Sequence, residues 1–208
     1  MRAEGAARPG LRERKKIKLR RNAQIEAFRL FEAQGYGHTT VEQIAAAAEI
    51  STATFYRYFP TKEDVVFGDE YDSAIEAVLS CRPADEPLVA TVQAVTAVLA
   101  TAAETDRKFN LARLRLIATV PALEARYASQ ERRSVDLFSD LFARRTGLAS
   151  TDYQVQLTAA AFVAVLFTAS RQWAKESAAG LGVLVREATT TIEPLLTALD
   201  HAHHDQPG

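Results

Sequence analysis

The sequence predicts an all-α protein made of a small N-terminal domain and a larger helical domain. Its 208 residues are 48% hydrophobic, which is enough to form real cores in two domains. Alanine is abundant, and the alternation of apolar and polar residues that marks strands is scarce. Charge also divides the chain, because residues 1–62 carry 12 Lys and Arg against 6 Asp and Glu, whereas residues 63–208 carry 13 against 20.

The net charge of −1 therefore hides a basic N-terminal part and an acidic remainder. This asymmetry is typical of a domain that meets a polyanion, joined to one that does not; a solvated charged tail is the alternative. The single cysteine, Cys81, excludes an intramolecular disulfide and fits a cytoplasmic location. No signal-peptide pattern is present, and the longest apolar run, residues 157–169, is too short to span a bilayer.

The N-terminal domain is expected over residues 1–61, and the composition of residues 1–11 is typical of disorder. A helix is predicted over about residues 12–34, with a basic first half and an apolar face farther along. Gly35 suits the left-handed conformation that often ends a helix. The basic run is Lys15, Lys16, Lys18, Arg20 and Arg21, and the apolar face is Ile25, Phe28, Leu30 and Phe31.

Two short helices follow this first one. Thr40 and Gln43 form a capping-box pattern that opens a helix over about 41–48. The next helix is expected over 51–59 and ends before Pro60. Two short helices joined by a tight turn make the helix-turn-helix outline that is used to bind DNA.

The second short helix separates an aromatic face from a tip of small residues. Phe55 and Phe59 are four residues apart, so they share a face that packs on the preceding helices. Its first turn holds Thr52, Ala53 and Thr54. Short side chains at this place let a backbone approach base edges in the major groove, where hydroxyl and methyl groups can read them.

Three larger side chains lie outside the buried face of this helix. Tyr56, Arg57 and Tyr58 can reach the phosphates that flank a major groove. Lys62, at the start of the next helix, adds positive charge and free amides for a phosphate. A plain helical hairpin is the alternative, but two tyrosines and an arginine outside the core fit it poorly.

The stretch AFRLFEAQGYGHTTVEQIAAAAEISTATFYRYFPTKEDVV resembles the DNA-binding domain of TetR-family transcriptional regulators, and the match covers about residues 12–66. The resemblance implies that Thr52, Ala53 and Thr54 face bases, while the basic run of the first helix is either a further DNA contact or a solvated arm. It also implies phosphate contacts from Thr40, Tyr56, Tyr58 and Lys62. One departure is Glu49, which stands where the family usually has glycine and is expected to strain the turn slightly.

The second domain is expected over residues 62–202, with a disordered tail over 203–208. A helix over about 62–80 would join the two domains, and the cap signals Pro121 and Gly147 bound a later helix. The remaining helices are expected near 88–104, 106–118, 121–146, 151–178 and 181–200.

Two apolar surfaces of this domain suggest self-association. The helix over 151–178 is apolar on most of its circumference, and the last helix carries a seam with spacings of four and three. Pro194 should kink or break that last helix. The alternative is that both surfaces are buried within one chain, whereas the TetR resemblance implies a homodimer formed through them. The seam is Leu181, Val185, Ala188, Ile192, Leu195 and Leu199.

The middle helices are expected to enclose an effector pocket, as the resemblance implies. Arg113 and Arg115 could meet an anionic head group there, or pair with local carboxylates such as Glu124 or Glu131. The stretch RLRLIATVPALEARYASQERR also resembles regulators whose C-terminal domains bind acyl-CoA-like ligands, including mycofactocin-associated ones. The candidate lining residues are Phe109, Arg113, Arg115, Leu116, Tyr127, Phe162, Leu166 and Trp173.

The leading interpretation is a homodimeric, ligand-responsive regulator, a repressor that binds palindromic operator DNA and is released by a small, largely apolar effector. No phosphate loop, nucleophile elbow, metal motif or cofactor motif points to an enzyme. The C-terminal histidines, His201, His203 and His204, are interpreted as a solvated tail. The alternative function is a helical small-ligand-binding module without specific DNA binding, which binding to duplex DNA at two salt concentrations would distinguish.

Overall fold

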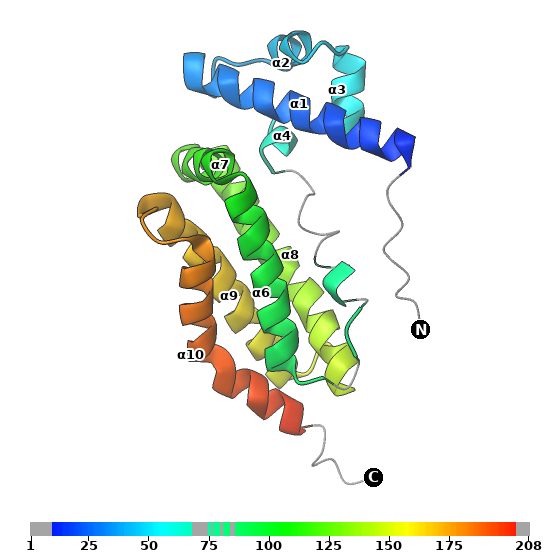
Figure 1. The fold of residues 1–208 in the computed structure, drawn as a ribbon, viewed down its shortest axis with the longest axis vertical. Helices are drawn as coiled ribbons and strands as arrows, with labels where there is room; N and C mark the ends of the chain where they lie inside the picture. Colours follow the sequence, from blue (N-terminus) through cyan, green and yellow to red (C-terminus); the bar gives the residue numbers. More distant parts are fainter. Residues whose placement is uncertain (1–9, 68–74, 76, 80, 84–85, 203–208) are drawn as a thin grey trace. The chain divides into compact units, whose positions relative to one another are not determined.

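The computed structural model describes residues 10–67, 75, 77–79, 81–83 and 86–202, and every element in this part of the chain is a helix (Figure 1). The predicted all-α class is therefore confirmed. Contacts divide the chain into an N-terminal unit, Met1–Gly68, and a C-terminal unit, Asp69–Gly208. The boundary falls later than the predicted one at 61/62, because the short helix α4 (Asp64–Phe67) contacts α1.

The N-terminal unit is a cluster of three helices with α4 added at its end. Helix α1 packs on α2, and α2 packs on α3. Phe55 and Phe59 are fully buried and their rings lie 5.2 Å apart, as the four-residue spacing predicts. Ile44 of α2 and Val65 of α4 are also fully buried, so each short helix contributes to this core. The bounds are Leu11–Gln34 for α1, Val41–Ala47 for α2 and Thr52–Tyr58 for α3.

Local caps fix where these helices begin and end. The predicted capping box is present, since the Thr40 hydroxyl accepts from the Gln43 amide and the Gln43 side chain accepts from the Thr40 amide. After α2, the amide of Ile50 donates to the carbonyl of Ala45, which closes a Schellman motif. The left-handed residue in that motif is Glu49, with φ 57°. The predicted strain at Glu49 therefore has a structural basis.

The C-terminal unit is a bundle in which α9 occupies the centre, with α7, α8 and α10 against it, while α6 packs mainly on α10. Trp173 and Phe162 of α9 are completely buried. Asp200 near the end of α10 accepts from the first amide of α6, that of Leu88, at 2.9 Å, so it caps a helix distant in sequence. The bounds are Leu88–Thr105 for α6, Arg107–Thr119 for α7, Pro121–Thr146 for α8, Tyr153–Lys175 for α9 and Leu181–Ala202 for α10.

Two expectations concern the linking helix over 62–80 and the effect of Pro194 on the last helix. The predicted helix over 62–80 begins with α4, and residues 75 and 77–79 are helical, but residues 68–74 lie outside the described part. Pro194 does not break α10, which continues through it; Figure 1 shows the helix bending in its red C-terminal part.

The proposed self-association seam of α10 is wrong as an exposed surface. Leu181, Val185, Ile192 and Leu199 are each at most 8% exposed within the single chain, because this face of α10 packs against α6 and α9. The alternative, burial within one chain, holds for these four residues, whereas Ala188 and Leu195 of the same seam are half-buried. The apolar run of α9 is only partly covered, since Phe162 is buried while Leu157 is 39% exposed.

Two helices, α6 and α9, are long and apolar enough to cross a membrane by length and composition. Within the C-terminal unit both contribute buried residues to one core, including Val92 and Val95 of α6 and Val155 of α9. Core helices of this kind pass the same composition test, so this feature is weak evidence for a membrane span.

Candidate nucleic-acid interface

The first turn of α3 presents short side chains to solvent. Thr52 and Ala53 are exposed and Thr54 is half-buried. Ser51 caps the helix, since its hydroxyl accepts from the Thr54 amide at 3.1 Å and lies 2.9 Å from the Thr54 hydroxyl. Because Phe55 anchors the opposite face, this turn is held rigidly with its backbone open to a groove.

Arg57 and two tyrosines flank this turn. Tyr56 is 48% exposed, and its ring meets the buried ring of Phe55 edge-on. The guanidinium of Arg57 lies 5.1 Å from the ring centre of the half-buried Tyr58, which orders both side chains. The phenols and the guanidinium are thus placed beside the exposed turn, and these are groups that can donate hydrogen bonds to phosphate oxygens.

Thr40 stands at the exposed N-terminus of α2. Its side-chain oxygen accepts from the Gln43 amide at 3.3 Å. Hydrogen bonds from its own backbone and from the Thr40 hydroxyl hold the pKa of Glu42 below its ordinary value, so the Thr40 hydroxyl donates to that carboxylate. The Gln43 side chain in turn accepts from the side-chain amide of Gln34 at 2.8 Å, which ties the start of α2 to the end of α1. The arrangement fixes the Thr40 hydroxyl at an exposed helix start, and this hydroxyl would have to exchange the Glu42 carboxylate for a phosphate oxygen in order to contact DNA.

Lys62 is directed at the protein itself. Its ammonium donates to the carbonyl oxygens of Tyr36 at 2.9 Å and Thr39 at 3.1 Å. It also lies 4.0 Å from the centre of the Tyr36 ring, and the Tyr36 hydroxyl donates to a carboxylate oxygen of Glu63 at 2.7 Å. Sequence reasoning missed Tyr36 and Glu63, because they lie 27 residues apart and share no local pattern.

The pKa of Glu63 reflects this arrangement. Burial alone would raise the pKa, but hydrogen bonds from Tyr36, its own backbone and Thr61, with the charge of Lys62, lower it below the ordinary value. The carboxylate is therefore ionised at neutral pH and balances the ammonium beside it.

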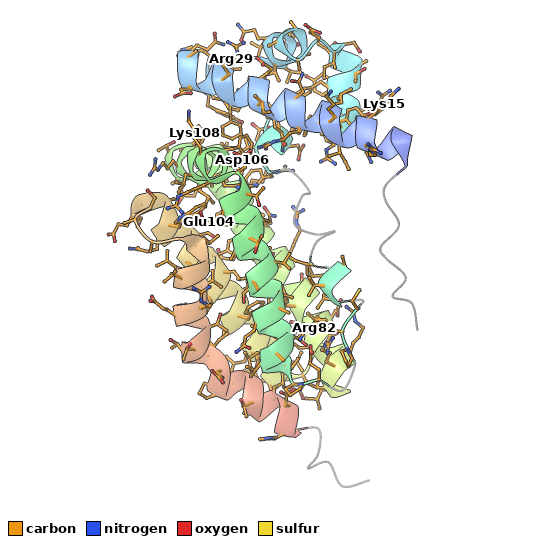
Figure 2. All side chains as sticks on the ribbon, in the orientation of Figure 1. Lys15, Arg29, Arg82, Glu104, Asp106 and Lys108 are labelled. Carbon is orange, nitrogen blue, oxygen red and sulfur yellow. The ribbon has the colours of Figure 1, made fainter. Side chains whose placement is uncertain are left out.

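The basic start of α1 is exposed from Arg14 to Lys18. Arg14, Lys15, Lys16 and Lys18 are all exposed, whereas Arg20 is half-buried and lies 5.5 Å from the centre of the Phe59 ring. Figure 2 shows Lys15 at the end of α1 beside α3. The charges thus extend past the aromatic core on the side where α3 ends.

The candidate effector residues occupy three surroundings in the C-terminal unit. Phe162 belongs to the main core, where its ring meets that of Phe138 edge-on at 4.8 Å. Trp173 is fully buried in a second cluster, against which Tyr127 and Leu166 pack. Phe109, Arg113 and Leu116 are half-buried on α7.

Tyr127 is a half-buried phenol of this region whose pKa is raised above its ordinary value. Burial raises the pKa of its phenol, although a hydrogen bond with Ser170 and the charges of Arg171 and Arg113 oppose this. Its ring lies 4.7 Å from that of Phe167. The phenol is therefore neutral and suited to exchange a hydrogen bond within an apolar site.

Two of these charged groups, Glu131 and Arg115, take partners that the sequence did not suggest. Glu131 pairs with Arg171, at 2.6 Å, a residue that sequence reasoning did not single out. Arg115 donates to the carbonyl of Ala174 at 3.0 Å and thus holds the C-terminal end of α9. Arg107 also holds this end through the carbonyl of Ser177, and it too was missed.

Surface grooves in the described part of this unit lie along α6 and α10. The more enclosed one has a volume of about 390 Å³ and is lined by threonines, alanines, Gln93, Arg186 and Glu193. None of the eight predicted effector residues lines it. Over the same described residues, no group of His, Cys, Asp and Glu gathers in a way that could hold a metal ion. Residues 203 and 204 lie outside them.

Family profiles match both units. The profile described as "Bacterial regulatory proteins, tetR family" matches residues 26–67, and the one described as "MftR C-terminal domain" matches residues 85–197. The chain is 36% identical over 202 residues to the HTH-type transcriptional regulator TcmR of Streptomyces glaucescens, a match that covers 91% of this chain and 89% of TcmR.

Solved structures show the same fold. FadR of Thermus thermophilus, a TetR-family repressor crystallised with lauroyl-CoA, aligns with a TM-score of 0.54 at 22% identity, covering 83% of this chain and 92% of FadR. FadR of Bacillus halodurans, a fatty acid degradation regulator, aligns with a TM-score of 0.57 at 17% identity, covering 85% and 97%. At these identities the likeness concerns the fold alone.

Proposed function

The chain belongs to the TetR family of bacterial transcriptional regulators, DNA-binding proteins rather than enzymes, and from this premise we propose that it is a homodimeric repressor released from a palindromic operator by a small effector. The observation that carries the proposal is the exposed, capped first turn of α3, which sits beside phenols and a guanidinium. Both sides of a DNA-protein contact, base edges and phosphates, find suitable groups there. Such a regulator works in the cytoplasm, where its operator is.

Thr52, Ala53 and Thr54 are proposed to face bases, with Thr40, Tyr56, Arg57 and Tyr58 near phosphates, whereas the ammonium of Lys62 is bonded within the protein. The first test is binding to the promoter of the chain's own gene region and to a random duplex, at several salt concentrations. A regulator loses affinity for both steeply as salt rises, through release of counterions, and prefers one site. Binding that is absent or independent of salt would instead favour a helical ligand-binding module.

Tyr56→Phe separates phosphate contacts from base contacts. Loss of one phenol-phosphate hydrogen bond should weaken binding to all sequences alike, by about 0.5–2 kcal/mol. Competition between the selected operator and random duplex measures this directly. A change in the preferred bases would show that Tyr56 reads sequence and would contradict its assignment.

A homodimer is proposed because one short helix reads few bases, whereas two copies read half-sites about 34–36 Å apart. The exposed face of α9 supports it, since Leu157, Ala160, Ala164 and Thr168 are exposed at helical spacing and offer a close-packing surface. Ala164→Arg should shift sedimentation toward the monomer and abolish operator binding, with Lys175→Arg, on the same helix, as a control. A monomeric wild-type protein would exclude the dimer.

The effector is proposed to be largely apolar with an acyl-CoA-like head, bound among the middle helices. Apolar clusters around Trp173, the neutral phenol of Tyr127 and the nearby charge of Arg113 support this class. The lauroyl-CoA in the Thermus FadR structure makes that compound the first to try. Native mass spectrometry of the purified protein, before and after addition of lauroyl-CoA, tests for a bound acyl thioester.

Release from DNA follows if the effector prefers an arrangement of the dimer that does not fit the operator. Such a preference lowers operator affinity through a coupling of about 1–3 kcal/mol. Operator binding titrated with and without effector measures this coupling, and equal affinities in the two titrations would contradict the proposed release.

A further inference from the structure

We infer that Lys62 is a positioning residue for DNA binding and that it acts through the turn between α1 and α2, not by contacting a phosphate. The inference rests on the proposed function and departs from the role that resemblance to the family gives this lysine. It concerns how the ammonium of Lys62 fixes Thr40, the proposed phosphate contact at the start of α2.

Most of the hydrogen-bonding capacity of the Lys62 ammonium is used within the protein, so little of it remains for DNA. An ammonium has three donors, and two of them are used by the carbonyls of Tyr36 and Thr39. The Tyr36 ring covers the same group, with its centre 4.0 Å away. Because Lys62 is half-buried, moving the ammonium to a phosphate would leave two carbonyls of the turn without this partner.

A chain of hydrogen bonds connects Lys62 to the capping box. Thr39, whose carbonyl it holds, is 1% exposed, and its hydroxyl donates to the carbonyl of Gly35 at 2.8 Å. Thr39 also accepts from the side chain of Gln34 at 3.2 Å, and Gln34 reaches the Gln43 side chain that accepts from the Thr40 amide. Thr40 is therefore fixed both by its neighbour in sequence and by this network.

The start of α4 provides a second hydrogen bond to the turn between α1 and α2. Glu63 follows Lys62 and accepts from the Tyr36 hydroxyl, so two consecutive residues hold the same turn. Val65 and Val66 then fix α4 in the core against α1. The turn that precedes Thr40 is thus joined to α4 through Lys62 and Glu63.

The experiment compares wild-type protein, Lys62→Met and Lys108→Met on one operator duplex over a range of salt concentrations. Lys62→Met should weaken binding about tenfold at fixed salt, the size expected when charge-assisted hydrogen bonds that fix a contact are lost. The slope of log Kd against log salt should match that of Lys108→Met, which removes the same charge from an exposed position of α7, in the other unit of the chain. A phosphate contact at Lys62 would instead lower the slope by about 0.9 per protomer relative to that control.

A double-mutant cycle with Thr40→Ala tests the route. If Lys62 acts through Thr40, the operator affinity of the double variant is nearly equal to that of whichever single variant binds the operator less tightly. Independent, additive losses would overturn the inference. General destabilisation does not produce this coupling, and circular dichroism melts establish that each variant is folded at the binding temperature.

Tyr36→Phe keeps the inference testable if Lys62→Met does not fold. It removes the bond to Glu63 without changing charge and should weaken binding about threefold at an unchanged salt slope. Unchanged affinity would overturn the positioning role. A wild-type protein that fails to bind duplex DNA would refute the proposed function and this role together, whereas a reduced slope in Lys62→Met alone would refute only the role of Lys62.

Discussion

Replacement of Glu49 by glycine should stabilise the N-terminal unit. Glu49 adopts the left-handed backbone conformation, which glycine occupies more easily than a residue with a side chain. Glu49 has φ 57° and is exposed, and its amide donates to the carbonyl of Ala46 in the Schellman motif that ends α2. A side chain in the left-handed region costs about 1–2 kcal/mol, and glycine costs about 0.5–1 kcal/mol in backbone entropy. Glu49→Gly should therefore raise the free energy of unfolding by roughly 0.5–1 kcal/mol, the difference of these two terms.

Urea denaturation followed by circular dichroism measures this change, and two control variants interpret it. Glu49→Ala removes the same charge but keeps the strained conformation, so it should leave the free energy of unfolding nearly unchanged. Ala46→Gly, at an exposed position within α2, should cost about 0.5–1 kcal/mol. If Glu49→Gly destabilises the protein as Ala46→Gly does, the strain argument is refuted; if Glu49→Ala stabilises it equally, charge is the cause.

Three further predictions concern base reading, a distant cap and acid stability. Thr54→Ala should change which bases are preferred in a selected operator pool, and an unchanged pool with unchanged affinity would exclude Thr54 from base reading. Asp200→Ala should lower the free energy of unfolding by about 1 kcal/mol, because the Leu88 amide loses its cap; an unchanged denaturation midpoint would contradict this. Because folding lowers the pKa of Glu63, its contribution is complete above the ordinary value of 4.5 and is lost as pH falls through the lower folded value. Tyr36→Phe should reduce that loss in acid titrations of stability.

Much of the N-terminal unit, and one helix end of the C-terminal unit, followed from local patterns. The capping box at Thr40 and Gln43, the cap at Ser51 and the left-handed Gly147 after α8 are interactions within a few residues, so short segments determine them. The four-residue spacing of Phe55 and Phe59 likewise fixed which face of α3 is buried and, by elimination, which face is open.

The candidate site was less predictable wherever a side chain finds a partner far along the chain. Lys62 reads as a DNA-facing cation by its position, yet its partners are carbonyls 26 and 23 residues away. Arg115 reads as a ligand-binding cation, yet it holds the end of α9, 59 residues away. Nothing in the spacing of either residue reveals which backbone carbonyl is its partner, because every residue of the chain offers the same group.

The sequence by itself determined the helices, their caps, the aromatic core of the N-terminal unit and the small, open tip of α3, because periodicity and capping act over one or two turns. Only the tertiary structure decided what covers each apolar face and which partner each long cation takes. The seam of α10 is the clearest case, since its spacing shows that Val185 and Leu199 are buried but not whether another chain or its own α6 and α9 bury them. Burial is a property of a face, whereas the identity of the neighbour depends on how the whole chain packs.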